Sequence, residues 1–176
     1  ALDALVLTKN DKQIEAWANE FAQTFPKQRK HFLSLAGTSV LSQTAAISGT
    51  GANDQQAWQT LNRFDVATAD AYKKKTYYKN KVNLARKLKK FSDMDGALRS
   101  FNALKNLDPE EKKFGLENRV WLSELQLNFD AAYQAYKKLK TGNWLELARM
   151  ADVAEKPSSN YYYNFLKNTK DKDLAF

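Results

Sequence analysis

The sequence predicts an all-α chain, built as an α-solenoid of antiparallel helical hairpins. Apolar residues recur at intervals of three and four along most of its 176 residues, and no sustained alternation of two indicates a strand. The six glycines and three prolines are fewer than the many tight turns of an all-β chain need. Four apolar stripes also follow one another at a spacing of about 35 to 43 residues, which is typical of helical-repeat solenoids.

Each apolar stripe begins just after an aspartate, at Asp11, Asp54, Asp95 and Asp130. A short carboxylate at these positions can accept hydrogen bonds from the free amides of a helix start. The stripes consist of Ile14, Trp17, Phe21 and Phe25; Trp58, Leu61 and Phe64; Leu98, Phe101 and Leu104; and Tyr133, Tyr136 and Leu139. We expect further helices between them, over residues 2–9, 28–47, 71–91, 111–127 and 144–155. The chain then alternates two kinds of helix, and stacked hairpins cover each other's apolar faces.

The two best hairpins align when Asp95 is set against Asp130. In this register, 35 residues apart, small residues meet small ones and large apolar residues meet large ones. Ala97 and Ala132 are the small members, and we expect the first helix of each hairpin to cross closely there. A bulkier side chain would push the two helices apart.

Residues 78–109 carry a set of small and apolar side chains on two consecutive helices. The set is Leu84, Ala85 and Leu88 on the first helix and Met94, Ala97, Leu98, Phe101, Leu104 and Pro109 on the second. In these residues the hairpin resembles the tetratricopeptide repeat. Residues 113–142 resemble it less closely, with Val120 at the small first-helix position and Leu127 in place of the usual turn glycine, and the part before residue 70 departs from it further. The resemblance implies hairpins stacked into a right-handed superhelix.

We expect one domain of helical-hairpin repeats over residues 1–156, with its best repeats at 71–109 and 111–142. A break near Pro157 opens a C-terminal segment, residues 157–176, which contains the aromatic run Tyr161–Tyr163. We expect this segment to form a capping helix and tail, because the last repeat of a solenoid must cover its neighbour's exposed face. A loose tail is the alternative.

The sequence predicts no enzyme, cofactor or metal site. It contains no cysteine and a single histidine, His31, whereas a transition-metal site needs several such ligands. Each carboxylate has a structural role open to it, as a helix cap or on a solvated helix face. Gly49 and Gly51 lack the Gly-Lys-Ser/Thr sequence of a phosphate-binding loop, so no small-molecule ligand is indicated. No run approaches the roughly 18 apolar residues of a membrane span, and the sequence leaves the cellular compartment open.

The strongest functional signal is a basic stretch over residues 73–90, in a chain whose formal net charge is +8. It contains nine basic residues and no acidic one: Lys73, Lys74, Lys75, Lys79, Lys81, Arg86, Lys87, Lys89 and Lys90. Tyr72, Tyr77 and Tyr78 lie beside them, and basic residues mixed with aromatic ones can bind phosphates and stack bases. The alternatives are a solvated helix face whose tyrosines pack inward and a surface that attracts an acidic protein.

The resemblance also implies which side chains line the concave groove, because the first helix of each such hairpin faces it. The predicted partner-binding residues are Lys79, Asn83, Arg86 and Lys89 on one first helix and Asn118 and Trp121 on the next. Lysine, asparagine and arginine on adjacent first helices are similar to the donors with which some members of the family hold a peptide carboxylate. Lys137 and Lys138 belong to a second helix, and we expect them to face outward.

We therefore expect a non-catalytic scaffold that binds an acidic or carboxylate-bearing, extended segment of another protein. The first alternative is a helical-repeat protein that binds nucleic acid, whose affinity would fall steeply with salt. The second is the non-catalytic superhelical arm of a larger enzyme or export machine, similar to those of lytic transglycosylases or outer-membrane exporters. If the groove is not the binding site, the aromatic end at residues 161–163 is the next candidate.

Overall fold

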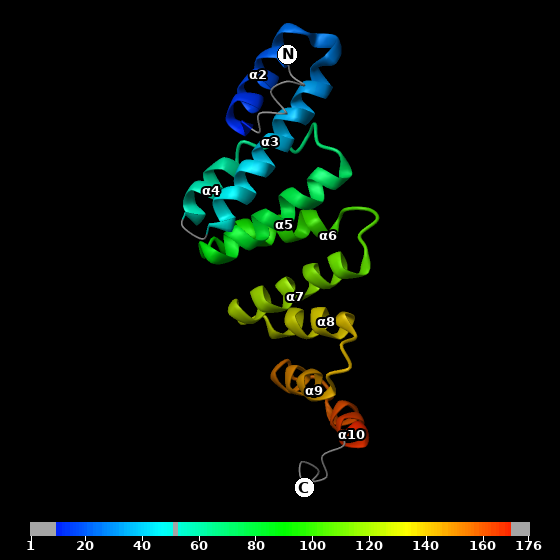
Figure 1. Cartoon of the computed structure of the whole chain (residues 1–176). Helices are drawn as coiled ribbons and strands as arrows, with labels where there is room; N and C mark the ends of the chain where they lie inside the picture. Colours follow the sequence, from blue (N-terminus) through cyan, green and yellow to red (C-terminus); the bar gives the residue numbers. More distant parts are fainter. Residues whose placement is uncertain (1–9, 51–52, 170–176) are drawn as a thin grey trace. The chain divides into compact units, whose positions relative to one another are not determined.

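The structure, a computed structural model, describes residues 10–50 and 53–169, and all the regular structure in these residues is helical (Figure 1). The elements in chain order are α2 (Asp11–Thr24), the short 3₁₀ helix η1 (Pro26–Gln28), α3 (Arg29–Gly49), α4 (Asp54–Leu61), α5 (Ala71–Lys87), α6 (Phe91–Asn102), α7 (Pro109–Leu125), α8 (Phe129–Leu139), α9 (Trp144–Val153) and α10 (Ser159–Asn168). The all-α prediction is confirmed for the described residues. The helix expected over residues 2–9 lies outside them. No described helix is both long and apolar enough to cross a membrane.

The expected helix spans lie close to the observed ones. The spans 28–47, 111–127 and 144–155 correspond to α3, α7 and α9. Helix α5 begins at residue 71 as expected, but it ends well before residue 91 because the backbone turns left-handed at Lys89 (φ 57°). The backbone amide of Lys90 then donates to the carbonyl of Ala85 (2.8 Å), which closes the last turn of the helix.

Asparagine, not aspartate, caps three of the helices that the aspartate-led stripes predict. The side chains of Asn10, Asn53 and Asn128 each accept a hydrogen bond from the backbone amide three residues later, at 3.3, 2.9 and 3.2 Å. Asp11, Asp54 and Asp130 follow these caps and lie in the first turn of α2, α4 and α8. Asp95 lies inside α6, beyond its first turn. The predicted aspartate caps are therefore wrong, although a carboxylate in a first turn still favours the helix start.

The described residues divide between two compact units, unit 1 within residues 1–105 and unit 2 within residues 106–176. The boundary falls inside the range 1–156 that we expected to form one repeat domain. A single repeat domain, and superhelical stacking of hairpins across this boundary, stay predictions.

Unit 1 packs consecutive helices against one another: α2 on α3, α3 on α4, α4 on α5, and α5 on α6 (Figure 1). The large side chains that it buries completely include Leu61 of α4, Val82 of α5, and Leu98 and Phe101 of α6. Burying a side chain of this size contributes about 1.5–3 kcal/mol. The apolar stripes of α4 and α6 therefore face the core of unit 1, as their helical spacing predicts.

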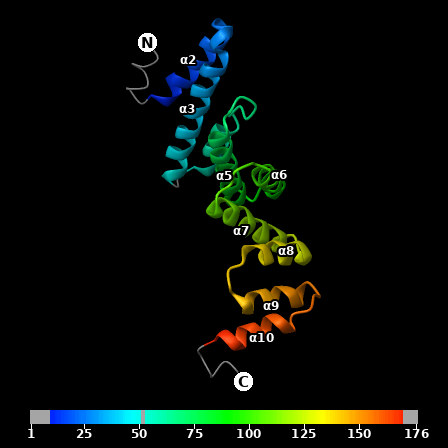
Figure 2. The same cartoon turned by 90° about the vertical axis from the view of Figure 1, so that its right-hand side faces the viewer.

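Unit 2 packs α7 on α8, α8 on α9, and α9 on α10 (Figure 2). One hydrophobic cluster in its core consists of Val120, Ala132, Tyr133, Ala135, Met150 and Ala151. Helix α10 lies in the segment that we expected to form a capping helix. The hydroxyl of its Tyr162 donates to the carboxylate of Asp152 in α9 (2.6 Å), and this contact adds to the packing between the two helices.

The hairpins α5–α6 and α7–α8 share one plan. Asp70 and Asp108 cap their first helices with closely similar backbone angles, φ/ψ −69°/172° and −72°/172°. Left-handed residues, Lys89 and Leu127, follow the ends of these helices. Both pairs lie 38 residues apart, so the register of 35 that sets Asp95 against Asp130 is wrong by about one helical turn.

Candidate functional site

Three of the predicted partner-binding residues form a row along α5. Lys79, Asn83 and Arg86 are spaced by four and three residues, which places them on one face of the helix. Asn83 and Arg86 are exposed and line a hollow of about 330 Å³. The other described residues that line this hollow, here named the α5 hollow, are Ser48 of α3 and Asn80, Leu84 and Lys87 of α5. The structure thus brings two of the predicted residues to one concave site in unit 1.

Lys89 does not continue this row. Helix α5 ends at Lys87, and Lys89 is the left-handed residue that reverses the chain toward α6. Its side chain is exposed but leaves the backbone in a direction that differs from the helical row. Lys89 therefore does not lie on the helix face that carries the other predicted residues of α5.

Asn118 and Trp121 lie on α7, in unit 2. Asn118 is only 6% exposed, and its side-chain amide donates to the backbone carbonyl of Phe114 one turn earlier (2.9 Å). Trp121 is half-buried. Because these residues and the α5 row belong to different units, the groove that would join them stays a prediction.

Two lysines of the basic stretch form ion pairs with aspartates of unit 1. Ion pairs join Lys73 to Asp70 (3.1 Å) and Lys87 to Asp54 (3.0 Å). A hydrogen bond from the backbone amide of Lys73, and another from its ammonium group, lower the pKa of the Asp70 carboxyl. Asp70 therefore stays ionised as the cap of α5. The pairs are partly solvated, so each contributes little to stability.

The tyrosines in and beside the basic stretch differ in exposure. Tyr77 is buried and stacks on Phe64, with ring centres 4.9 Å apart and planes inclined by 17°. Tyr78 is half-buried and meets Tyr77 edge-on at 5.1 Å. Tyr72 is 77% exposed. Of the three rings, one is thus fully available to stack on a base.

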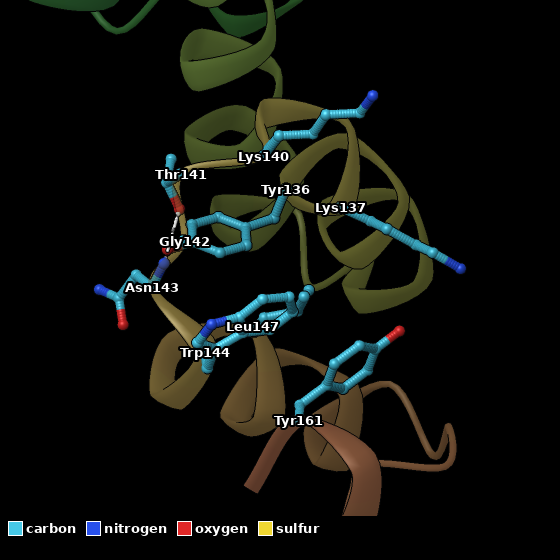
Figure 3. Close-up of a pocket in the computed structure, with 9 residues that line it drawn as sticks. All are labelled: Tyr136, Lys137, Lys140, Thr141, Gly142, Asn143, Trp144, Leu147 and Tyr161. Atoms are coloured by element: carbon cyan, nitrogen blue, oxygen red, sulfur yellow. Dashed lines mark hydrogen bonds between the residues drawn. The ribbon is translucent and has the colours of Figure 1, made fainter. Parts of the chain in front are cut away.

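A second candidate site is a pocket of about 390 Å³ in unit 2, here named the aromatic pocket (Figure 3). It is lined by residues from α8, the α8–α9 turn, α9 and α10: Tyr136, Lys137, Lys140, Thr141, Gly142, Asn143, Trp144, Leu147 and Tyr161. The rings of Tyr136, Trp144 and Tyr161 lie around it together with Leu147, whereas the ammonium groups of the two lysines extend away (Figure 3). The pocket thus has an apolar interior and a cationic edge.

The α8–α9 turn holds its wall of the pocket in one conformation. Lys140 (φ 50°) and Gly142 (φ 73°) are both left-handed, a conformation that glycine adopts without steric cost. The backbone amide of Asn143 donates to the hydroxyl of Thr141 (3.3 Å), and the Asn143 side chain accepts the backbone amide of Glu146 (3.2 Å). This cap starts α9 at Trp144, so the turn fixes where the indole leaves the backbone.

A hydrogen bond to α8 holds Tyr161 in place. Its hydroxyl lies 2.8 Å from the hydroxyl of Tyr133, a residue of α8 that is 6% exposed. This hydrogen bond, together with burial, raises the pKa of Tyr133 to about 12. The Tyr133 phenol therefore holds its proton more tightly than an ordinary tyrosine, and the hydrogen bond ties α10 to α8.

The sequence did not predict the aromatic pocket, although one of its residues, Tyr161, belongs to the aromatic end that is the next candidate after the groove. Lys137 is exposed and also lines the pocket, and its ammonium group lies 5.9 Å from the centre of the Tyr133 ring. Its neighbour Lys138 is exposed and does not line the pocket. The available signal was an aromatic residue on each side of a glycine-containing turn, Tyr136 before it and Trp144 after it.

The described ranges hold no group of three or more His, Cys, Asp or Glu side chains placed to bind a metal ion. His31 is exposed and meets the ring of Phe32 edge-on at 5.7 Å. Glu124 and Glu146 line a small cleft of about 120 Å³ in unit 2. Burial raises the pKa of the Glu124 carboxyl, and the neighbouring charge of Glu146 adds to this effect.

Comparison of the chain with protein-family models, curated proteins and solved structures gives no match. The relationship to the tetratricopeptide repeat therefore rests on the sequence of residues 78–109 and stays a proposal.

Proposed function

We propose that this chain is a non-catalytic interaction scaffold, similar to tetratricopeptide-repeat proteins, that binds an acidic, extended segment of a partner protein. The observation that carries the proposal is the α5 hollow, where Asn83 and Arg86 line one concave site with Asn80 and Lys87. A guanidinium group offers paired donors to a carboxylate. Asparagine carboxamides can both donate to and accept from the backbone of an extended peptide.

The charge around the hollow supports an acidic partner. Helix α5 contains seven basic residues and no acidic one, and none of the described residues that line the hollow is acidic. A surface of one sign attracts the opposite charge over a range of about 10 Å at 0.1 M salt. Binding should therefore be faster and tighter at low salt.

The exposure of the tyrosines favours protein over nucleic acid as the partner. Proteins that bind single strands without sequence preference stack successive bases on exposed aromatic rings. In the basic stretch Tyr77 is buried against Phe64 and Tyr78 is half-buried, which leaves Tyr72 as the open platform. A row of cations without a row of open rings fits carboxylates better than bases.

The proposal is tested by capture of partners from the cells that make the protein, followed by measurement of Kd. Arg86→Glu should weaken binding of the captured protein at least tenfold, about 1.4 kcal/mol, and leave the thermal midpoint nearly unchanged. Lys138→Glu is the matched control, because it makes the same charge change in the last turn of another helix. The captured protein should be acidic and should be lost at about 0.5 M salt.

Three outcomes would contradict the proposal. Equal weakening by Arg86→Glu and Lys138→Glu would mean that general electrostatics, and not the α5 hollow, governs binding. No weakening by either variant would place the binding site elsewhere on the chain. Recovery of nucleic acid in place of an acidic protein would select the alternative function.

A further inference from the structure

We propose that the aromatic pocket of unit 2 is a separate peptide-binding site, which takes one large apolar side chain of an extended segment that carries carboxylates beside it. The pocket belongs to a different unit from the α5 hollow and shares no residue with it. The proposal therefore stands or falls independently of the function proposed for α5.

The size of the pocket suits an amino-acid side chain. Its volume of about 390 Å³ is at the lower end of the range for small-molecule sites, roughly 300–1,000 Å³. Such a space accepts a phenylalanine or leucine side chain with its backbone. It leaves little room for a ligand as large as a dinucleotide.

The chemistry of the lining favours an apolar group over a base or a sugar. Most of the pocket surface is apolar, and Tyr136, Trp144, Leu147 and Tyr161 are among the residues that line it. The hydroxyl of Thr141 already accepts the backbone amide of Asn143 and lies 3.4 Å from the Tyr136 hydroxyl. A base or sugar carries several polar groups, and the few polar groups of the lining could replace only some of the hydrogen bonds that such a ligand makes to water, which costs free energy.

The positive charge at the edge of the pocket indicates that the ligand carries a negative charge beside its apolar side chain. Lys137 and Lys140 extend from the pocket, and none of the described residues that line it is acidic (Figure 3). Their alkyl stems contact the apolar interior while the ammonium groups reach water. A carboxylate next to the buried side chain would therefore meet one or both cations.

The pocket is also largely formed before any ligand binds. Tyr161 is held by its hydrogen bond to Tyr133, and the cap of α9 at Asn143 fixes the backbone from which Trp144 projects. A site whose walls are already fixed loses less conformational entropy on binding. The fixed walls of the aromatic pocket therefore support its proposed role in binding a peptide.

The test uses the indole N–H signal of Trp144 in nuclear magnetic resonance spectra of the full chain. The chain has four tryptophans, and Trp144→Phe identifies the signal by removing it. The probes are two blocked synthetic peptides, one with a single phenylalanine between glutamates and one with alanine in its place. We expect the phenylalanine peptide to shift the Trp144 signal and the alanine peptide to leave it unchanged.

Charge reversal separates the edge of the pocket from the rest of α8. Lys137→Glu should weaken binding of the phenylalanine peptide about threefold or more, whereas Lys138→Glu, one residue later and outside the pocket, should not. Arg86→Glu should have no effect on the Trp144 signal. A failure of the function proposed for the α5 hollow is therefore distinguishable from a failure of the proposal for the aromatic pocket. Equal shifts with both peptides, or a shift with oligothymidylate alone, would overturn the proposal, as would no shift at millimolar peptide.

Discussion

The hydroxyl groups of Tyr133 and Tyr161 lie 2.8 Å apart and join α8 to α10 across the side of the aromatic pocket. Tyr133 belongs to the core of unit 2, and Tyr161 lines the pocket. The bond therefore links the stability of the last helix to the shape of the candidate site.

Tyr133→Phe should lower the free energy of unfolding by about 1 kcal/mol, because it removes this hydrogen bond and leaves the ring in place. The cost should depend on pH. The pKa of Tyr133 rises from 10.0 to about 12 on folding, so its contribution is fully present below pH 10 and is lost as the pH rises to about 12. Urea unfolding at pH 9 and at pH 11.5 measures the difference; an equal gap between wild type and variant at both values would contradict the assignment.

The reassigned helix caps lead to a second prediction. Asn128→Ala should destabilise unit 2 by about 1 kcal/mol, because the amide of Ala131 loses its acceptor. Asp130→Ala should cost less, about 0.5 kcal/mol, since Asp130 supplies only a first-turn charge and an exposed ion pair with Lys156. The denaturant midpoints of the two variants show which substitution destabilises unit 2 more. A larger loss of stability for Asp130→Ala would mean that Asp130, and not Asn128, caps α8.

Leu127 is the site of a stabilising substitution. It is left-handed (φ 57°) and 74% exposed, so glycine would relieve backbone strain and sacrifice little packing. Leu127→Gly should raise the free energy of unfolding by about 0.5–1 kcal/mol. Gln126→Gly, one residue earlier at a negative φ, is the control and should lower it by a similar amount. A lower thermal midpoint for Leu127→Gly would show that contacts of the leucine side chain outweigh the backbone strain.

Overpacking tests the two small residues of the second helices. Ala97 is 4% exposed and Ala132 is fully buried, and replacing either by leucine should cost about 1–3 kcal/mol. Ala16→Leu, on an exposed face of α2, is the control and should change stability by less than about 0.5 kcal/mol. Thermal or denaturant unfolding of the three variants measures the losses. A loss as small as the control's at residue 97 or 132 would mean that no close helix crossing occurs there.

Helical periodicity predicts much of this fold, but not the alignment between hairpins. The spans of α3, α5, α7 and α9 follow from the apolar pattern and its interruptions. A shift of three or four residues keeps an apolar stripe in phase, so the pattern cannot distinguish a register of 35 from one of 38. The same limit applies to caps, because asparagine and aspartate both cap well and here stand next to each other, as at Asn10 and Asp11.

The two candidate sites differ in how well the sequence predicts them. Asn83 and Arg86 lie on one helix, so their spacing of three predicts a shared face. The rings of the aromatic pocket come from three helices, and their convergence depends on the left-handed residues of the α8–α9 turn and on the Tyr133–Tyr161 bond. That the exposed Lys137 also lines a pocket could not be predicted for the same reason, since the pocket is formed by residues distant in sequence.

The most direct test of the central claim is a nuclear magnetic resonance titration of the full chain with a synthetic glutamate-rich peptide. We predict that the side-chain amide signals of Asn80 and Asn83, which line the α5 hollow, shift as the peptide is added and recover when salt is raised to about 0.5 M. The glutamine counterpart of the peptide should leave them unchanged. Signals that respond to oligothymidylate and not to the acidic peptide would contradict the account.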